Sequence, residues 1–62
     1  MKAQEFLKKL NKKNANIKKI EGQAFADCTE HDYTEEGYSD MEYWRFDDGS
    51  MLSYDGRGYL AR

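Results

Sequence analysis

The residue types that perform nucleophilic, acid–base or metal chemistry are scarce in this 62-residue chain. His31 is the single histidine and Cys28 is the single cysteine. Structural zinc sites use four ligands at recognisable spacing, and a nucleophilic serine or cysteine needs a neighbouring base. The chain meets neither requirement. We therefore expect His31 to be a solvated loop residue and Cys28 to be a small buried apolar group.

Two further patterns resemble known site motifs and fail on their spacing. Asp47-Asp48-Gly49-Ser50 resembles the start of a calcium-binding loop, but Gly58 stands where that loop has its bidentate glutamate. The glycines follow neither the Walker nor the dinucleotide-binding spacing. A chain this short also leaves little room for a pocket that would raise the pKa of a carboxyl group. The sequence therefore predicts no enzyme activity, no metal and no cofactor.

Residues suited to binding are more abundant, and carboxylates interleaved with tyrosines form the first candidate surface. Residues 30 to 40 are expected to be an acidic loop, of a length typical of functional or disordered connections. Carboxylates on a rigid surface can occupy sites built for nucleic-acid phosphates, and tyrosine is a frequent hot-spot residue. This segment predicts a protein-binding module that inhibits or regulates a nucleic-acid-handling complex. Its candidate partner-binding residues are Glu30, Asp32, Tyr33, Glu35, Glu36, Tyr38 and Asp40.

The alternative surface consists of lysines near the N-terminus and would bind nucleic acid directly. Its candidate residues are Lys8, Lys9, Lys12 and Lys13, with Lys2, Lys18 and Lys19 on either side. Lysines on neighbouring helical turns can neutralise phosphates, and aromatic side chains on an exposed sheet face can stack on bases. The net charge of −2 and the lack of arginine in this segment make direct nucleic-acid binding the second choice.

Both surfaces reflect a charge asymmetry along the chain. Residues 1–21 carry seven lysines and two acids, a net charge of +5, whereas residues 22–62 carry three arginines and ten acids, a net charge of −7. Such polarity indicates an electrostatic partner for one end of the molecule. The open alternative is internal neutralisation, with a basic helix lying across an acidic sheet and loop.

An amphipathic helix is the first element that must position these residues. Its apolar face consists of Ala3, Phe6, Leu7 and Leu10, at the spacing i, i+3, i+4 and i+7. This pattern predicts a helix over about residues 2–14, followed by an asparagine in the left-handed conformation that ends many helices. The isoleucines at positions 17 and 20 either extend the apolar stripe by a turn or belong to the connection that follows.

A strand is predicted next. Gly22 ends the preceding element in this interpretation, and residues 23–29 alternate in polarity as a strand does. The register is open, because either the small residues at positions 24, 26 and 28 or the larger Phe25 could face the core.

The strongest local signal predicts a β-hairpin over residues 41–54, around an Asp-Gly pair. A two-residue turn would pair Phe46 with Met51, whereas a three-residue loop with Gly49 in the left-handed conformation pairs Phe46 with Ser50. We favour the second register because it gives the cleaner apolar face. That face holds Trp44, Phe46, Leu52 and Tyr54. A turn over 55–58 and a short strand over 59–61 complete the chain.

These elements predict one α+β domain over residues 1–62, with the N-terminal amphipathic helix packed on a three- to four-stranded antiparallel sheet, an αβββ meander. Met51, Tyr43 and Tyr59 would lie outside the core and allow a homodimer. In size, charge and aromatic content the chain resembles the small acidic proteins that phages and mobile elements encode against host defence, including anti-CRISPR proteins. The single cysteine and the lack of a long apolar run predict a cytoplasmic protein outside the membrane.

Overall fold

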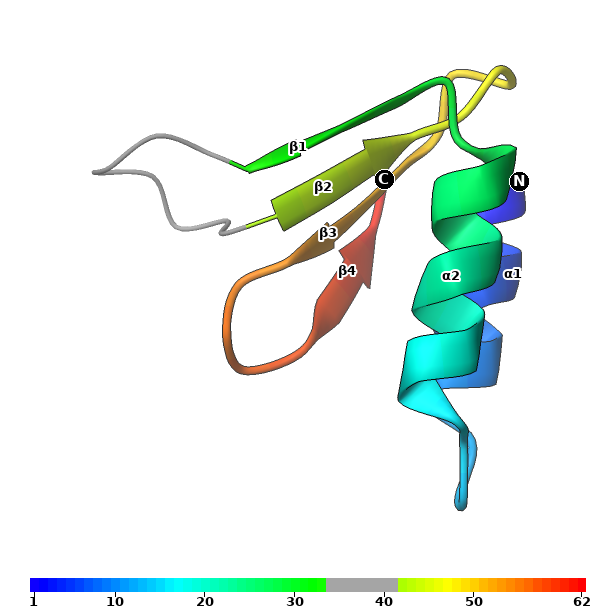
Figure 1. Cartoon of the computed structure of the whole chain (residues 1–62), viewed down its shortest axis with the longest axis vertical. Helices are drawn as coiled ribbons and strands as arrows, with labels where there is room; N and C mark the ends of the chain where they lie inside the picture. Colours follow the sequence, from blue (N-terminus) through cyan, green and yellow to red (C-terminus); the bar gives the residue numbers. More distant parts are fainter. Residues whose placement is uncertain (34–41) are drawn as a thin grey trace.

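The computed structural model describes residues 1–33 and 42–62, and these residues form an α+β fold, as predicted. Its elements are α1 (Lys2–Leu10), α2 (Ile17–Asp27), β1 (Glu30–Tyr33), β2 (Glu42–Arg45), β3 (Met51–Tyr54) and β4 (Tyr59–Ala61). The strands form an antiparallel sheet in the order β1-β2-β3-β4, and the two helices lie side by side at one end of it (Figure 1). Neither helix of this described part is long and apolar enough to cross a membrane.

The first helix is shorter than the sequence predicts. It buries Ala3, Phe6 and Leu10 against the sheet and ends at Leu10, although the periodicity favoured a helix to about residue 14. Asn11 caps the helix in the right-handed conformation, with a φ of −86°. The prediction of a left-handed asparagine at this helix end is therefore wrong, and the left-handed residue is Asn14, with a φ of 67°, in the connection between the two helices.

The predicted strand over residues 23–29 is wrong, because Ile17–Asp27 forms α2. The helix begins at Asn16, whose side chain accepts a hydrogen bond from the backbone N–H of Lys19 at 3.2 Å. Its inner side carries Ile20 and Ala24, four residues apart, so the helical period outweighs the short alternation. The isoleucines at 17 and 20 thus belong to a second helix, which neither alternative in the sequence anticipated.

Gly22 lies inside α2 and does not end it. A glycine in a helix interior costs about 1 kcal/mol relative to alanine, and α2 forms nonetheless because Ile20 and Ala24 pack against the core. Phe25 is not the inward residue, since 60% of its surface is exposed. Cys28 ends the helix half-buried, with its thiol donating to the carbonyl oxygen of Phe25.

The β2–β3 hairpin has the predicted register. The backbone N–H of Phe46 donates to the carbonyl oxygen of Ser50 at 2.9 Å, and Gly49 has a φ of 86°. Trp44 stands opposite Leu52, and both side chains are buried on the face that meets the helices. The ring of Phe6 stacks on that of Phe46, with 5.3 Å between ring centroids. This aromatic contact joins α1 to the hairpin at the centre of the core.

The first strand lies where a loop was expected. Glu30–Tyr33 pairs with β2 in antiparallel register, with His31 opposite Trp44. This pairing satisfies backbone groups that a loop would leave to water. The rest of the predicted acidic loop, residues 34–40, lies outside the described residues, as does Met41 at the start of the predicted hairpin.

The N-terminus of α1 is capped by the β2–β3 hairpin. The N-cap residue Met1 makes no side-chain cap bond, and the first N–H groups of the helix are satisfied from far along the chain. The N–H of Lys2 donates to Asp48 Oδ2 at 2.8 Å, and that of Ala3 donates to Ser50 Oγ at 3.1 Å. Ser50 also donates from its hydroxyl to Asp48, so the two caps support each other.

Removal of the buried cap is expected to destabilise the fold. Ser50→Ala leaves the N–H of Ala3 buried without its acceptor and lowers the free energy of unfolding by about 1 to 2 kcal/mol. Urea denaturation at neutral pH measures this change. The matched control is Ser53→Ala, a second buried serine of the same hairpin, whose hydroxyl makes no bond to α1 within the described residues. Equal losses for the two variants would contradict the cap.

The carboxyl group of Asp48 is expected to make the free energy of unfolding depend on pH in the acid range. Its bonds with the Ser50 hydroxyl and with the backbone N–H groups of Lys2 and Ser50 lower the pKa of its carboxyl group from 3.8 to about 2. A depressed folded-state pKa stabilises the fold above about pH 4, and this contribution is lost as the pH falls towards 2. Urea denaturation between pH 6 and about 2 should show this loss in the wild type and a smaller one in Asp48→Asn. Identical pH profiles would refute this role of Asp48.

Candidate functional site

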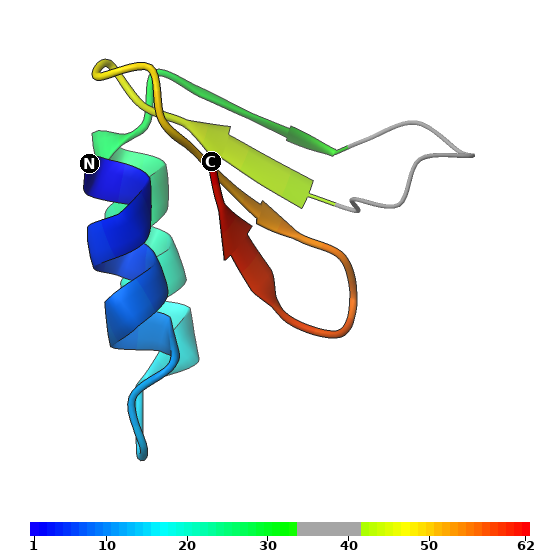
Figure 2. The same cartoon turned by 180° about the vertical axis from the view of Figure 1, so that it is seen from behind.

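Six exposed lysines gather at the end of the helical hairpin that lies farthest from the β2–β3 turn. They form the lysine cluster: Lys8, Lys9, Lys12, Lys13, Lys18 and Lys19. The last residues of α1, the connection and the first turn of α2 supply them, and residues 6–20 contain no acid. The connection that joins the helices points away from the sheet in both opposite views (Figures 1 and 2). The fold thus brings the four predicted lysines together and adds the pair from α2.

The lysines of the cluster have no carboxylate partners among the described residues. Among the described residues, Lys9 is the one member whose ammonium group contacts another side chain, and it lies 5.3 Å from the centroid of the Phe6 ring. Glu5 lines the same surface hollow as Lys8, Lys9 and Lys12, but forms no ion pair with them in the described part of the chain. The six lysines therefore present an excess of positive charge to solvent.

Most of the described carboxylates, in contrast, are engaged, in that they accept a hydrogen bond or form an ion pair within the fold. Three of the twelve, Glu35, Glu36 and Asp40, lie outside the described residues. Of the nine that are described, eight accept a hydrogen bond or form an ion pair, and Glu5 is the exception. These contacts neutralise or orient acids within the fold. Among the described residues most acids therefore have partners within the fold, whereas the lysines of the cluster have no carboxylate partner.

Lys2 shows where internal neutralisation does occur. It lies at the capped end of α1, and its ammonium group is 2.8 Å from Asp47 and 3.6 Å from Asp27. The bond with Asp47 is the main cause that raises the pKa of the Lys2 amine. Within the described residues this is the only lysine that the acids neutralise, so the predicted mutual cancellation of helix and sheet is confined to one end of α1.

The predicted acidic surface is divided by the strand that carries it. Side chains alternate along β1, so Glu30 and Asp32 share one face with their partners Arg45 and Tyr43, and Tyr33 lies on the other. Glu30 forms an ion pair with Arg45 and accepts a hydrogen bond from the Tyr43 hydroxyl. Burial of that hydroxyl, followed by its bond with Glu30, raises the pKa of Tyr43. Glu35, Glu36, Tyr38 and Asp40 lie outside the described residues. Of the seven predicted residues the structure describes three, and it places the carboxylates of Glu30 and Asp32 on the face of β1 opposite to Tyr33.

Aromatic side chains line the flank of the molecule where α2 meets β1. His31 is not a solvated loop residue: its ring stacks on the buried Trp44, and its Nε2 lies 2.6 Å from a carboxylate oxygen of Glu42. Phe25 and Tyr33 meet the His31 ring edge-on, with centroids 5.2 and 5.5 Å away. Both are largely exposed, at 60% and 66% of their surface. Together Phe25, His31 and Tyr33 form a partly exposed aromatic flank.

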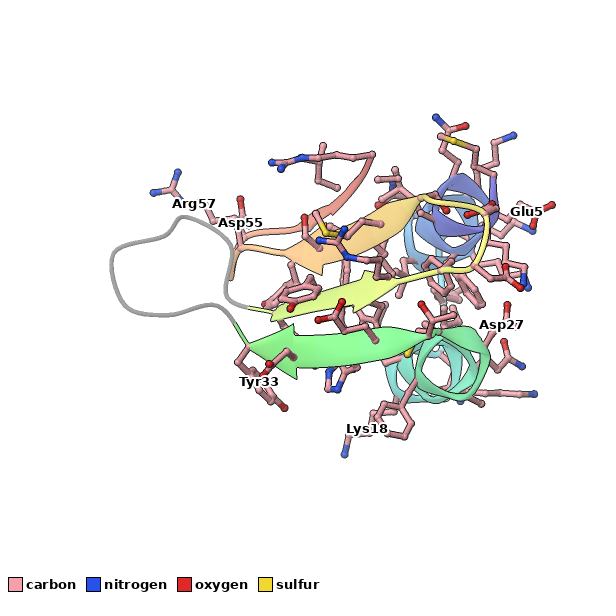
Figure 3. All side chains as sticks on the ribbon, turned by 90° about the horizontal axis from the view of Figure 1, so that it is seen from above. Glu5, Lys18, Asp27, Tyr33, Asp55 and Arg57 are labelled. Atoms are coloured by element: carbon pink, nitrogen blue, oxygen red, sulfur yellow. The ribbon has the colours of Figure 1, made fainter. Side chains whose placement is uncertain are left out.

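Sequence reasoning missed this flank. Phe25 was assigned to a strand and His31 to a loop, so their contact could not be anticipated. The signal that could have found it is helical spacing, because Lys18, Gly22 and Phe25 follow i, i+4 and i+7 and lie on one side of α2. Figure 3 shows Lys18 and Tyr33 projecting on the same side of the molecule.

The residues proposed to lie outside the core are mostly half-buried. Tyr59 packs against the core and donates its hydroxyl to Glu21 of α2, and burial raises the pKa of that hydroxyl well above its ordinary value. Met51 and Tyr43 are also only partly exposed. Homodimer formation through these residues stays a prediction.

No group of three metal-ligating side chains occurs within residues 1–33 and 42–62.

The contrast between Lys2 and the cluster predicts a difference in reactivity. Under limiting acylation at mildly alkaline pH, Lys2 is expected to react more slowly than the six lysines of the cluster. Its bond with Asp47 restrains the side chain and raises the pKa of the amine, so less of the reactive, unprotonated form is present. Peptide mapping by mass spectrometry measures each site. Asp47→Asn should speed acylation of Lys2 and leave the cluster unchanged. Equal rates at Lys2 and Lys12 in the wild type would contradict the pairing.

The chain was compared with family models, curated proteins and solved structures. None of the three comparisons found a match.

Proposed function

We propose that the protein binds nucleic acid through the lysine cluster. The supporting observation is the pairing of charges: six exposed lysines have no carboxylate partner in the described residues, whereas eight of nine described carboxylates are engaged. A polyanion is the ligand class that such a surface attracts, since each neutralised phosphate releases a counterion. This reverses the order of the two hypotheses that the sequence favoured.

The position of Lys18 and Lys19 adds a second argument. They occupy the first turn of α2, where the helix dipole is already positive, so their charges are unfavourable for the isolated helix. A phosphate bound there would interact favourably with both lysines and with the dipole. Lys8 and Lys9 lie in the last turn of α1, where positive charge is favourable, and complete the patch from the neighbouring helix.

A net charge of −2 does not oppose this function, because the charges are separated in space. Exposed charges farther apart than about 8 to 10 Å are largely screened at physiological salt. Asp27 and Asp47 pair with Lys2 at the other end of α1, about 12 Å from Leu10 along the helix axis if each residue rises 1.5 Å. A phosphate at the cluster therefore meets mainly local positive charge.

Lysine contacts give affinity without base readout. Lysine acts as a mobile point charge, whereas bidentate recognition of guanine is commonly an arginine property. We therefore propose binding that is salt-dependent and tolerant of sequence, by a protein of the cytoplasm, where the single free thiol of Cys28 would stay reduced.

A protein-binding module is the second candidate function. It is supported by the exposure of Asp32 and Tyr33 at the end of β1, directly before residues 34–41 in the sequence. An inhibitor or regulator of a nucleic-acid-handling complex remains the form that this candidate takes. It differs from the first in its main prediction, because it requires no affinity for free nucleic acid.

Salt-dependent binding tests the proposed function. Fluorescence anisotropy of a labelled duplex should show binding at about 50 mM salt that weakens steeply by about 200 mM. Lys12→Gln/Lys13→Gln should weaken binding and reduce the slope of log affinity against log salt by up to about 1.8, because two phosphate contacts are lost.

The control is Arg45→Gln/Arg57→Gln, which removes the same charge from exposed positions outside the cluster. It should leave the salt slope unchanged. Equal weakening by both double variants would assign the effect to net charge and refute a local site. Failure of the wild type to bind any oligonucleotide at low salt would refute the function and favour the second candidate.

A further inference from the structure

We infer that the nucleic acid is single-stranded and that its bases stack on Phe25 and Tyr33. This inference rests on the proposed function and names its substrate class. Proteins that bind single strands combine positive charge for the backbone with aromatic rings for the bases. The lysine cluster supplies the first feature, and the aromatic flank supplies the second.

The two features are continuous along α2. Lys18 and Phe25 are seven residues apart, so they lie on the same side of the helix, about 10 Å from each other along its axis. Gly22 lies between them, and a Cβ placed on it would meet no described atom within 4 Å. No side chain at Gly22 therefore separates Lys18 from Phe25 on this side of α2.

The rings are held in place before any ligand binds. His31 contacts Phe25 on one side and Tyr33 on the other, and it stacks on Trp44, which is only 2% exposed. Glu42 fixes the His31 ring from the neighbouring strand. Exposed aromatic rings on a rigid support lose little conformational freedom on binding, which favours affinity.

The charges around the flank are compatible with a single strand. Glu42 and Glu21, the carboxylates on the helix side of the sheet, are bonded to His31 and Tyr59. Glu30 and Asp32 point to the opposite face of β1. Near the rings a bound strand would thus present its bases, while its phosphates lie towards the lysines. A duplex cannot bind in this way, because its bases are stacked within the helix.

Paired oligonucleotides test the inference. At low salt, labelled oligothymidylate of about 12 nucleotides should bind the wild type more tightly than a duplex of equal length. Phe25→Leu and Tyr33→Leu keep apolar bulk but remove the ring, and each should weaken oligothymidylate binding by at least about fivefold. Duplex affinity should stay unchanged. Leu60→Ala, an exposed apolar residue of β4 outside the flank, is the matched control and should change neither affinity.

A direct signal comes from Phe25→Trp, whose exposed indole should lose fluorescence when oligothymidylate stacks on it, in contrast to the buried Trp44. If both oligonucleotides bind in a salt-dependent way and the ring substitutions change neither affinity, the stacking site is refuted and the lysine site is retained. Absence of binding to either oligonucleotide would overturn both. Capture of a protein partner through Phe25 and Tyr33 without nucleic acid would also overturn the inference.

Discussion

The fold depends on the contact between the N-terminus of α1 and the β2–β3 hairpin. A helix of nine residues is marginal in water, and the first backbone N–H groups of α1 have no local acceptor. Asp48 and Ser50 supply the acceptors, and the Phe6 and Phe46 rings stack just inside them. This arrangement fixes the axis of α1 relative to the sheet. Because α2 lies beside α1, it also fixes where the opposite end of the helical hairpin points.

The same constraint separates the charges of the molecule. Lys2, Asp27 and Asp47 meet at the capped end, where opposite charges neutralise one another, while six lysines are held together at the other end. Each of the seven described acids of residues 22–62 accepts a hydrogen bond or forms an ion pair, whereas six of the seven lysines of residues 1–21 have no carboxylate partner among the described residues. Linear charge counts ranked the acidic surface first. We propose the lysine cluster instead because the structure distinguishes charges that have partners from charges that have none.

Much of the fold could be predicted from local patterns, and the errors have physical causes. The Asp-Gly turn and the aromatic alternation predicted the register of the β2–β3 hairpin, since turn geometry and side-chain period both favoured it. Residues 23–29 were misassigned because Gly22 was taken as a helix breaker, whereas the Asn16 cap and burial of Ala24 outweigh its cost. Pairing of β1 with β2 is a long-range contact that no local pattern shows. The four lysines of the site were predicted, but Phe25 and His31 were not, because their proximity depends on that misassigned helix.

The distant cap of α1 also determines when the chain can fold. Lys2 and Asp48 are 46 residues apart, so the capping partners of α1 are synthesised well after the helix itself. Until the β2–β3 hairpin emerges, α1 lacks both the acceptors for its first N–H groups and the ring on which Phe6 stacks. The helix therefore has its caps only once the β2–β3 hairpin is available, so we expect α1 and the hairpin to form in the same step.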